Sequence, residues 1–176
     1  MSGLDRVIER LLRAESIAPA EMDWLCERAE ALLSLEDNVV TVRAPVVIVG
    51  DIHGQFSDLL EVLGRVGLPP EQHYLFLGDL VDRGYNSVDV LALVLALKLR
   101  FPDCVNVLRG NHESRQLNQN YGFYDECRAK QFNWQAIINV FDFLPIAAVV
   151  DGRVFCVHGG LSESARTLDQ IRTIER

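Results

Sequence analysis

Four short polar segments of this 176-residue sequence combine glycine with side chains that bind metals or transfer protons. They are Gly50–Gly54 (GDIHG), Gly78–Gly84 (GDLVDRG), Gly110–Glu113 (GNHE) and His158–Gly160 (HGG). Glycine allows the backbone to turn sharply and to approach a ligand closely. Each pattern alone also occurs in ordinary turns and loops, so the indication of a functional site comes from finding all four in one chain.

The residue types predict a centre for two divalent cations. Asp51 and His53 are two positions apart, so in extended chain their side chains point to the same side and can hold one cation. Asp79 can bridge this cation to a second one held by Asn111 and His158. Mixed oxygen and nitrogen ligands favour Mn, Fe or Zn over Ca or Mg. Two cations about 3.5–4 Å apart suit phosphoryl transfer, because they clamp the attacking and leaving oxygens.

The polar segments follow apolar runs that predict strands. Residues 46–49, 74–77 and 105–108 are typical of strands buried on both faces. Helical periodicity lies between these runs, and the alternation of strand and helix predicts parallel βαβ units. Because polar groups collect beyond the carboxyl ends of such strands, the four segments are expected to meet at one edge.

The other elements complete an α/β fold class, or α+β by some schemes. Helices are predicted over 4–16, 20–34, 57–66 and 87–99, with further helical sequence to about residue 141. The apolar helix 87–99 is expected in the core. Runs at 146–150 and 154–157 flank Asp151-Gly152, a dipeptide typical of a tight hairpin that would make the sheet mixed.

Composition excludes several classes of protein. The chain has 17 Lys+Arg and 25 Asp+Glu, and the resulting charge of −8 argues against a binder of nucleic acid or anionic membranes. The longest apolar run, Val90–Leu97, is too short to span a bilayer. The N-terminus lacks the apolar stretch of a signal peptide. Four widely spaced cysteines without a CxxC motif indicate free thiols in the cytosol or nucleus.

The motifs resemble those of one known family. GDIHG, GDLVDRG, RGNHE and HGG, in this order, resemble the phosphoprotein phosphatases, a family of metal-dependent serine/threonine phosphatases. RGNHESRQ (109–116), YGFYDEC (121–127) and CVHGGLS (156–162) resemble its type 2A branch, and residues 4–17 and 167–176 resemble the phosphatase 4 and phosphatase 6 catalytic subunits. The resemblance implies a metallophosphoesterase-type β-sandwich flanked by helices. Residues 1–45 would be an N-terminal helical segment, and 46–176 an incomplete calcineurin-like domain.

The same resemblance implies roles for individual residues. One metal would be held by Asp51 and His53, the second by Asn111 and His158, and Asp79 would bridge the two. His112 is implied to be the general acid and Asp82 the group that holds it, with Arg83 and Asn111 binding the phosphate. Arg109 and Glu113 flank this Asn-His pair as a possible ion pair that frames the loop, and the sequence leaves a structural and a functional role equally open.

The implied reaction is hydrolysis of phosphoserine and phosphothreonine by a hydroxide that two metals (Mn, or Fe/Zn) activate, with regulatory or scaffold subunits as partners. Family catalytic domains continue beyond HGG and supply a further metal-binding His and a phosphate-binding Arg. We therefore expect the 176-residue chain alone to be weakly active or inactive, and poorly soluble. The alternatives are a non-catalytic form that binds regulatory subunits, and a metallophosphoesterase that acts on nucleotides or small phosphoesters.

Overall fold

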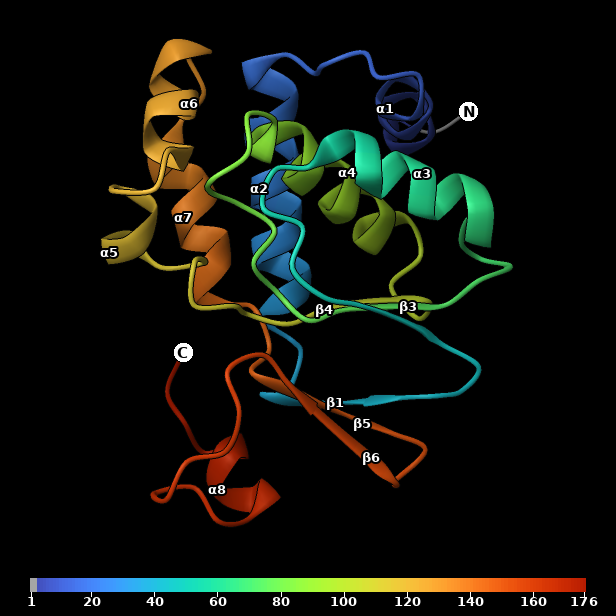
Figure 1. Cartoon of the computed structure of the whole chain (residues 1–176), viewed down its shortest axis with the longest axis vertical. Helices are drawn as coiled ribbons and strands as arrows, with labels where there is room; N and C mark the ends of the chain where they lie inside the picture. The colour runs from blue at the N-terminus through green and yellow to red at the C-terminus, as the bar shows by residue number, and fades with distance from the viewer. Residues whose placement is uncertain (1–2) are drawn as a thin grey trace.

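The computed structural model describes residues 3–176 and contains two three-stranded sheets, with α1 to α7 on one side and α8 beside the other sheet (Figure 1). The strands are β1 (Val39–Val42), β2 (Val47–Val49), β3 (Tyr74–Phe76), β4 (Val105–Val107), β5 (Ala147–Val150) and β6 (Val154–Val157). The helices are α1 (Gly3–Leu12), α2 (Pro19–Leu33), α3 (Phe56–Val66), α4 (Ser87–Arg100), α5 (Arg115–Asn118), α6 (Phe123–Ala129), α7 (Trp134–Asp142) and α8 (Leu168–Arg172).

One sheet has the predicted parallel βαβ arrangement. Its order is β2-β3-β4, and both pairs are parallel. Successive side chains of a strand point to opposite faces, and β3 uses both. Tyr74 and Phe76 enter the core beneath the helices, whereas Leu75 enters a second apolar cluster with Val42 and Ala148 of the other sheet. The two sheets therefore form a sandwich, and helices other than α8 cover the outer face of the parallel sheet (Figure 1).

The second sheet corrects the prediction of a single mixed sheet. Its order is β1-β5-β6, with β1 parallel to β5 and β5 antiparallel to β6. The β5-β6 hairpin turns at Asp151-Gly152 as predicted, and both residues have positive φ. However, this hairpin pairs with β1 instead of extending the parallel sheet. Strand β1, with the sequence VVTV, was not predicted.

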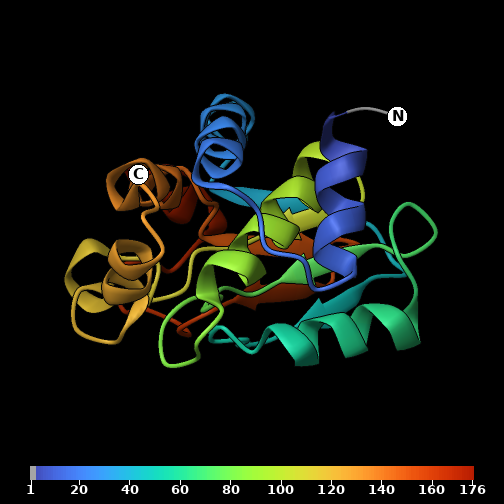
Figure 2. The ribbon, with the colours of Figure 1, turned by 90° about the horizontal axis from the view of Figure 1, so that it is seen from above.

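The helix α4 is the central element of the fold. Residues 87–98 are all buried, which confirms the prediction that this apolar helix is core. The helices α1 and α2 pack against it, and Figure 2 shows α4 passing beneath α1 through the middle of the molecule. Its one buried base, Lys98, is paired with Glu36 at 2.5 Å and donates to the carbonyl of Pro102. A helix with apolar residues on all sides has to be surrounded by other elements, and this explains the central place of α4.

Two further predictions meet different outcomes. The prediction that strand 46–49 is buried on both faces was wrong: Ile48 is 45% exposed, because β2 lies at an edge of its sheet. The domain boundary near residue 45 remains a prediction, although residues 3–45 share their core with the rest of the chain and contribute β1 to a sheet.

Within residues 3–176, no helix has the length and apolar character needed to cross a membrane.

Two buried cysteines provide a test of this core. Burial, together with nearby acidic side chains, raises the pKa of Cys26 and of Cys127 to about 12. At pH 8 roughly one thiol in 10⁴ would then be ionised, and the thiolate is the reactive form. We expect iodoacetamide to leave both unmodified in the native protein and to modify both in guanidinium chloride, as measured by peptide mass spectrometry. Fast native modification of either thiol would contradict the packing around α2 and α6.

Candidate metal and phosphate centre

The loops that follow four strands bring all eight predicted site residues together. They come from the carboxyl ends of β2, β3, β4 and β6, so both sheets contribute to the centre. The loop after β2 carries Asp51 and His53, that after β3 carries Asp79, Asp82 and Arg83, that after β4 carries Asn111 and His112, and that after β6 carries His158.

Asp79 lies at the middle of the potential metal ligands. Its Oδ2 is 3.5 Å from His53 Nε2 and 3.4 Å from His158 Nε2, and its side chain is 4% exposed. Asp51 completes the group, with carboxylate oxygens 3.8 Å from His53 Nε2 and 3.9 Å from His158 Nδ1. Two overlapping sets of three ligand atoms share Asp79: one adds Asp51 and His158, and the other adds His53 and His112. A carboxylate shared in this way is suited to bridging two cations.

The hydrogen bonds of the two histidines fit metal binding. Nδ1 of His53 donates to the carbonyl of Val81 at 2.8 Å, and Nδ1 of His158 donates to the carbonyl of Leu77 at 3.1 Å. A carbonyl only accepts, so each Nδ1 carries a proton, and Nε2 is the ring nitrogen that faces the cluster. Nε2 of His158 is 2.9 Å from Asn111 Oδ1. Metal-binding histidines are usually oriented by a hydrogen bond from the other ring nitrogen to a carbonyl, as Nδ1 of both histidines makes here. These residues therefore fit a divalent cation.

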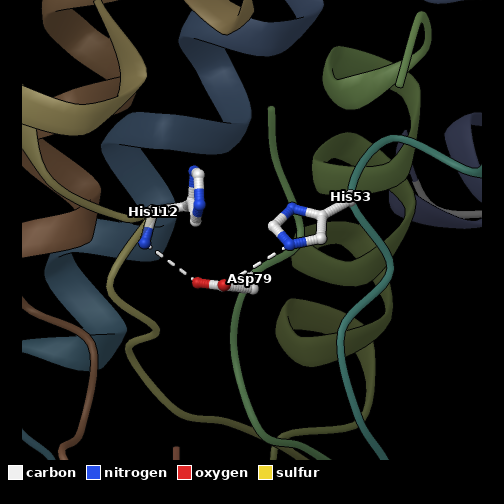
Figure 3. Close-up of side chains that lie close together, drawn as sticks. All are labelled: His53, Asp79 and His112. Carbon is white, nitrogen blue, oxygen red and sulfur yellow. Dashed lines mark hydrogen bonds and ion pairs between the residues drawn. The ribbon is translucent and has the colours of Figure 1, made fainter. Parts of the chain in front are cut away.

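His112 and Asp82 form a buried pair beside this cluster. Nδ1 of His112 is 2.7 Å from Asp82 Oδ2, and neither side chain is more than 3% exposed. The other carboxylate oxygen of Asp82 accepts the N–H of Phe123 at 3.0 Å. Figure 3 shows His53 and His112 on opposite sides of Asp79, whose Oδ1 accepts the backbone N–H of His112 at 2.9 Å. The imidazole therefore has a defined orientation, with Nδ1 held by Asp82.

Arg83 extends from this pair towards solvent. Its guanidinium is 3.4 Å from His112 Nε2 and lies over the ring of Tyr121, 5.9 Å from the ring centre. The backbone N–H of Arg83 also donates to the carbonyl of Tyr121 at 2.9 Å. An exposed guanidinium beside a cation centre is suited to bind phosphate oxygens in its planar fork.

The backbone of the centre adopts uncommon conformations. His53, Asp79, Asp82 and Arg83 all have positive φ, between 47° and 72°. A non-glycine residue in this region costs about 1–3 kcal/mol and persists only where surrounding contacts hold it. The loops are also in close contact, since a Cβ at Gly110 would overlap the carboxylate and backbone N–H of Asp79. Glycine at this position is therefore a steric requirement.

Glu113 holds two of these loops together, a role that the sequence left open. Its side chain is fully buried and accepts three backbone N–H groups, those of Asp79 at 2.7 Å, Leu80 at 2.9 Å and Gly110 at 2.8 Å. Burial raises the pKa of Glu113, and the three N–H donors act in the opposite direction. The loops after β3 and β4 are thus joined through one carboxylate.

The suggested ion pair between Arg109 and Glu113 is wrong. Arg109 donates to the backbone carbonyl of Glu113 at 3.0 Å, but its ion pair is with Asp142 at 3.1 Å. The carboxylate of Glu113 is already occupied by three N–H donors, so the guanidinium pairs elsewhere.

The sequence analysis also missed the acid that supports the Asp82 loop. Glu126 of α6 accepts the N–H groups of Ser87 and Val88 at 2.9 and 3.1 Å, at the start of α4. Its negative charge suits a helix N-terminus. Only the resemblance of YGFYDEC to a known segment drew attention to this region, and it assigned no role to Glu126.

Comparison with known proteins identifies the family. The family model for calcineurin-like phosphoesterases matches residues 44–176. The chain belongs to the calcineurin-like phosphoesterase family. The predicted mixed α/β metallophosphoesterase fold is therefore confirmed, and the described residues include candidate ligands for divalent metals.

Solved structures give more detail. A protein serine/threonine phosphatase from Saccharomyces cerevisiae, described as similar to human phosphatase PP5, matches with a TM-score of 0.91 and 32% identity over the whole chain. The chain spans 60% of that protein. A protein described as a candidate diadenosine tetraphosphatase matches at 27% identity and TM-score 0.56, over 76% of this chain and 59% of its own. A cold-active protein-tyrosine phosphatase from a psychrophilic Shewanella species, 22% identical with a TM-score of 0.59, shares the fold over 75% of this chain and 46% of its own.

Replacement of Glu113 tests the link between the loops. In Glu113→Gln an amide NH₂ would face a backbone N–H donor, leaving buried donors unpaired at a cost of about 1–3 kcal/mol. We expect the free energy of unfolding, measured by urea denaturation, to fall by about that amount. Glu71→Gln, at an exposed glutamate in the loop before β3, is the matched control and should change little. Equal stability of the two variants would show that the Glu113 carboxylate is dispensable.

Proposed function

We propose that this calcineurin-like phosphoesterase is a protein serine/threonine phosphatase that hydrolyses phosphoserine and phosphothreonine. The observation that carries the proposal is the His112–Asp82 pair, which lies between the Asp79-centred ligand cluster and the exposed guanidinium of Arg83. Cation ligands, an oriented imidazole and a phosphate-binding guanidinium are the groups that hydrolysis of a phosphate ester requires.

Each group of the centre has a distinct task in this mechanism. Arg83, with Asn111, binds the phosphate oxygens and orients the ester. His112 in its protonated form donates the Nε2 proton to the departing serine or threonine oxygen, because an alkoxide is a poor leaving group. Asp82 holds Nδ1 of His112, so that Nε2 points towards the substrate.

The metal ligands would hold two divalent cations, Mn or Fe/Zn. These are Asp51, His53, Asp79, Asn111 and His158. When bound, the cations would supply activation of a water molecule and neutralisation of phosphate charge. The ligands have mixed oxygen and nitrogen atoms, which favours these metals over Ca or Mg.

Two observations favour a protein substrate. Asp51, Arg83 and Asn111 are exposed, so the centre is open enough to admit a phosphorylated side chain from a large partner. The yeast structure that matches the whole chain is described as a protein serine/threonine phosphatase. The second candidate, hydrolysis of dinucleotide polyphosphates, has the support of a neighbour that covers less of the chain at a lower TM-score.

Broader features of the whole protein belong to the same proposal. They include membership of the type 2A branch near phosphatases 4 and 6, regulatory or scaffold subunits as partners, and a cytoplasmic or nuclear location. A short form that binds such subunits without catalysis is the non-enzymatic alternative. An intact set of ligands and the His112–Asp82 pair favour catalysis, since binding alone does not require them.

His112→Asn tests the catalytic mechanism. Loss of the general acid is expected to lower kcat about 10²–10⁴-fold on a phosphothreonine peptide with Mn²⁺, while Mn²⁺ affinity stays close to that of the wild type. His73→Asn, at a partly buried histidine outside the centre, is the matched control. Faster hydrolysis of diadenosine tetraphosphate than of the peptide would favour the second candidate. Binding of Mn²⁺ with no turnover of either substrate would favour the non-catalytic form.

Asp79→Asn tests the metal centre without an activity assay. The change removes the negative charge that lies between His53 and His158, and the amide can still accept the N–H of His112. We expect fewer Mn²⁺ ions bound per chain in isothermal titration calorimetry, with weaker binding of those that remain. Asp103→Asn, at an exposed aspartate before β4, should bind as the wild type does. Unchanged Mn²⁺ binding in Asp79→Asn would mean that the cations bind elsewhere.

A further inference from the structure

The last residue of α7 contacts both ends of the loop that carries Asn111 and His112. Oδ1 of Asp142 accepts from Arg109 at 3.1 Å, and its Oδ2 is paired with Arg115 at 2.6 Å. Arg109 is the second residue after β4, and Arg115 begins α5. One carboxylate therefore joins the two ends of residues 109–115, and each of its oxygens serves one end. We call these three residues the Asp142 clamp.

Further contacts attach the same loop to α7 and the segment that follows it. The backbone N–H of Arg109 donates to the carbonyl of Pro145 at 2.8 Å, and Arg115 also donates to Asn139 of α7 at 3.3 Å. Within the loop, Arg109 Nε donates to the carbonyl of Glu113 at 3.0 Å. Residues 109–115 are thus held by Glu113 on the buried side and by Asp142 on the outer side.

The environment of Asp142 favours a charged clamp. Burial alone would raise the pKa of Asp142, but the hydrogen bond from Arg115 and the charges of both arginines more than offset it, and the pKa lies below its ordinary value. The carboxylate is therefore ionised at neutral pH. Its side chain is 29% exposed, so solvent screens each ion pair, and the effect of the clamp comes from joining two points of one loop.

We propose that Asp142 is a positioning residue for the metal and phosphate centre. It acts through Arg109 and Arg115 to hold the 109–115 loop at the distance from Asp79 at which Asn111 and His112 reach the cluster. Asp142 itself contacts neither of these two residues, and it is not a catalytic residue. The inference rests on the proposed function, because the loop is significant only if the centre binds metal.

Asp142→Asn removes the negative charge and retains the size of the side chain. We expect Mn²⁺ affinity to fall roughly tenfold, as is typical when a group that orients a metal ligand is lost. Hydrogen exchange of the amides of residues 110–113 should accelerate in the metal-free protein. Asp103→Asn is the matched control and should match the wild type in both measurements. Asp142→Glu, which restores the charge, should recover most of the affinity.

A second variant keeps the test decisive if Asp142→Asn does not fold. Arg115→Gln removes only one arm of the clamp, at an arginine that is 45% exposed, and should give a smaller loss of affinity and a smaller acceleration of exchange. Wild-type Mn²⁺ affinity in a folded clamp variant, even with a lowered Tm, would overturn the positioning role. Failure of the wild-type chain to bind Mn²⁺ would instead overturn the proposed function, and with it the inference.

Discussion

The centre depends on one buried carboxylate, that of Glu113, which accepts three backbone N–H groups from two loops. A carboxylate without a partner would be costly at full burial, and an N–H group without an acceptor would be costly as well. The three bonds satisfy both requirements, and they place the backbone of Asp79 beside that of Gly110. The position of Asp79 in turn determines where His53, His158 and the backbone of His112 can lie. The hydrogen bonds of Glu113 are therefore the constraint by which the parallel sheet positions the side chains of the centre.

The remaining contacts hold the same loops from outside. Asp142 pairs with both ends of the loop after β4, and Glu126 accepts the first N–H groups of α4, next to the loop that carries Asp82. Glu126 lies on α6 and Asp142 on α7, two short helices that contact each other on the helical side of the molecule (Figure 1). The residues with positive φ keep this backbone conformation because these bonds oppose relaxation to commoner conformations. These hydrogen bonds and ion pairs thus stabilise an open and polar centre.

The division of tasks between the two sheets explains why the site is at their shared edge. The parallel sheet provides three loops, and the hairpin sheet provides His158. Side chains such as Leu75 and Ala148 belong to one apolar cluster between the sheets, and Asp79 and His158 follow strands of these two sheets. We expect a change in that packing to shift the candidate metal ligands although none of them is replaced. The apolar helix α4 supports the arrangement from the opposite face, where every residue from 87 to 98 is buried.

The sequence alone determined strands β2 to β6, helices α1 to α4, the hairpin at Asp151-Gly152 and the eight residues that meet in the centre. These features follow from local signals: apolar runs, helical periodicity, turn dipeptides and polar segments directly after strands. Only the tertiary structure decided that β1 pairs with β5, that β2 is an exposed edge, and that Arg109 pairs with Asp142 and not with Glu113. The partners in these contacts are distant in the chain or compete for one group, and the choice depends on which pairing satisfies all buried groups at once.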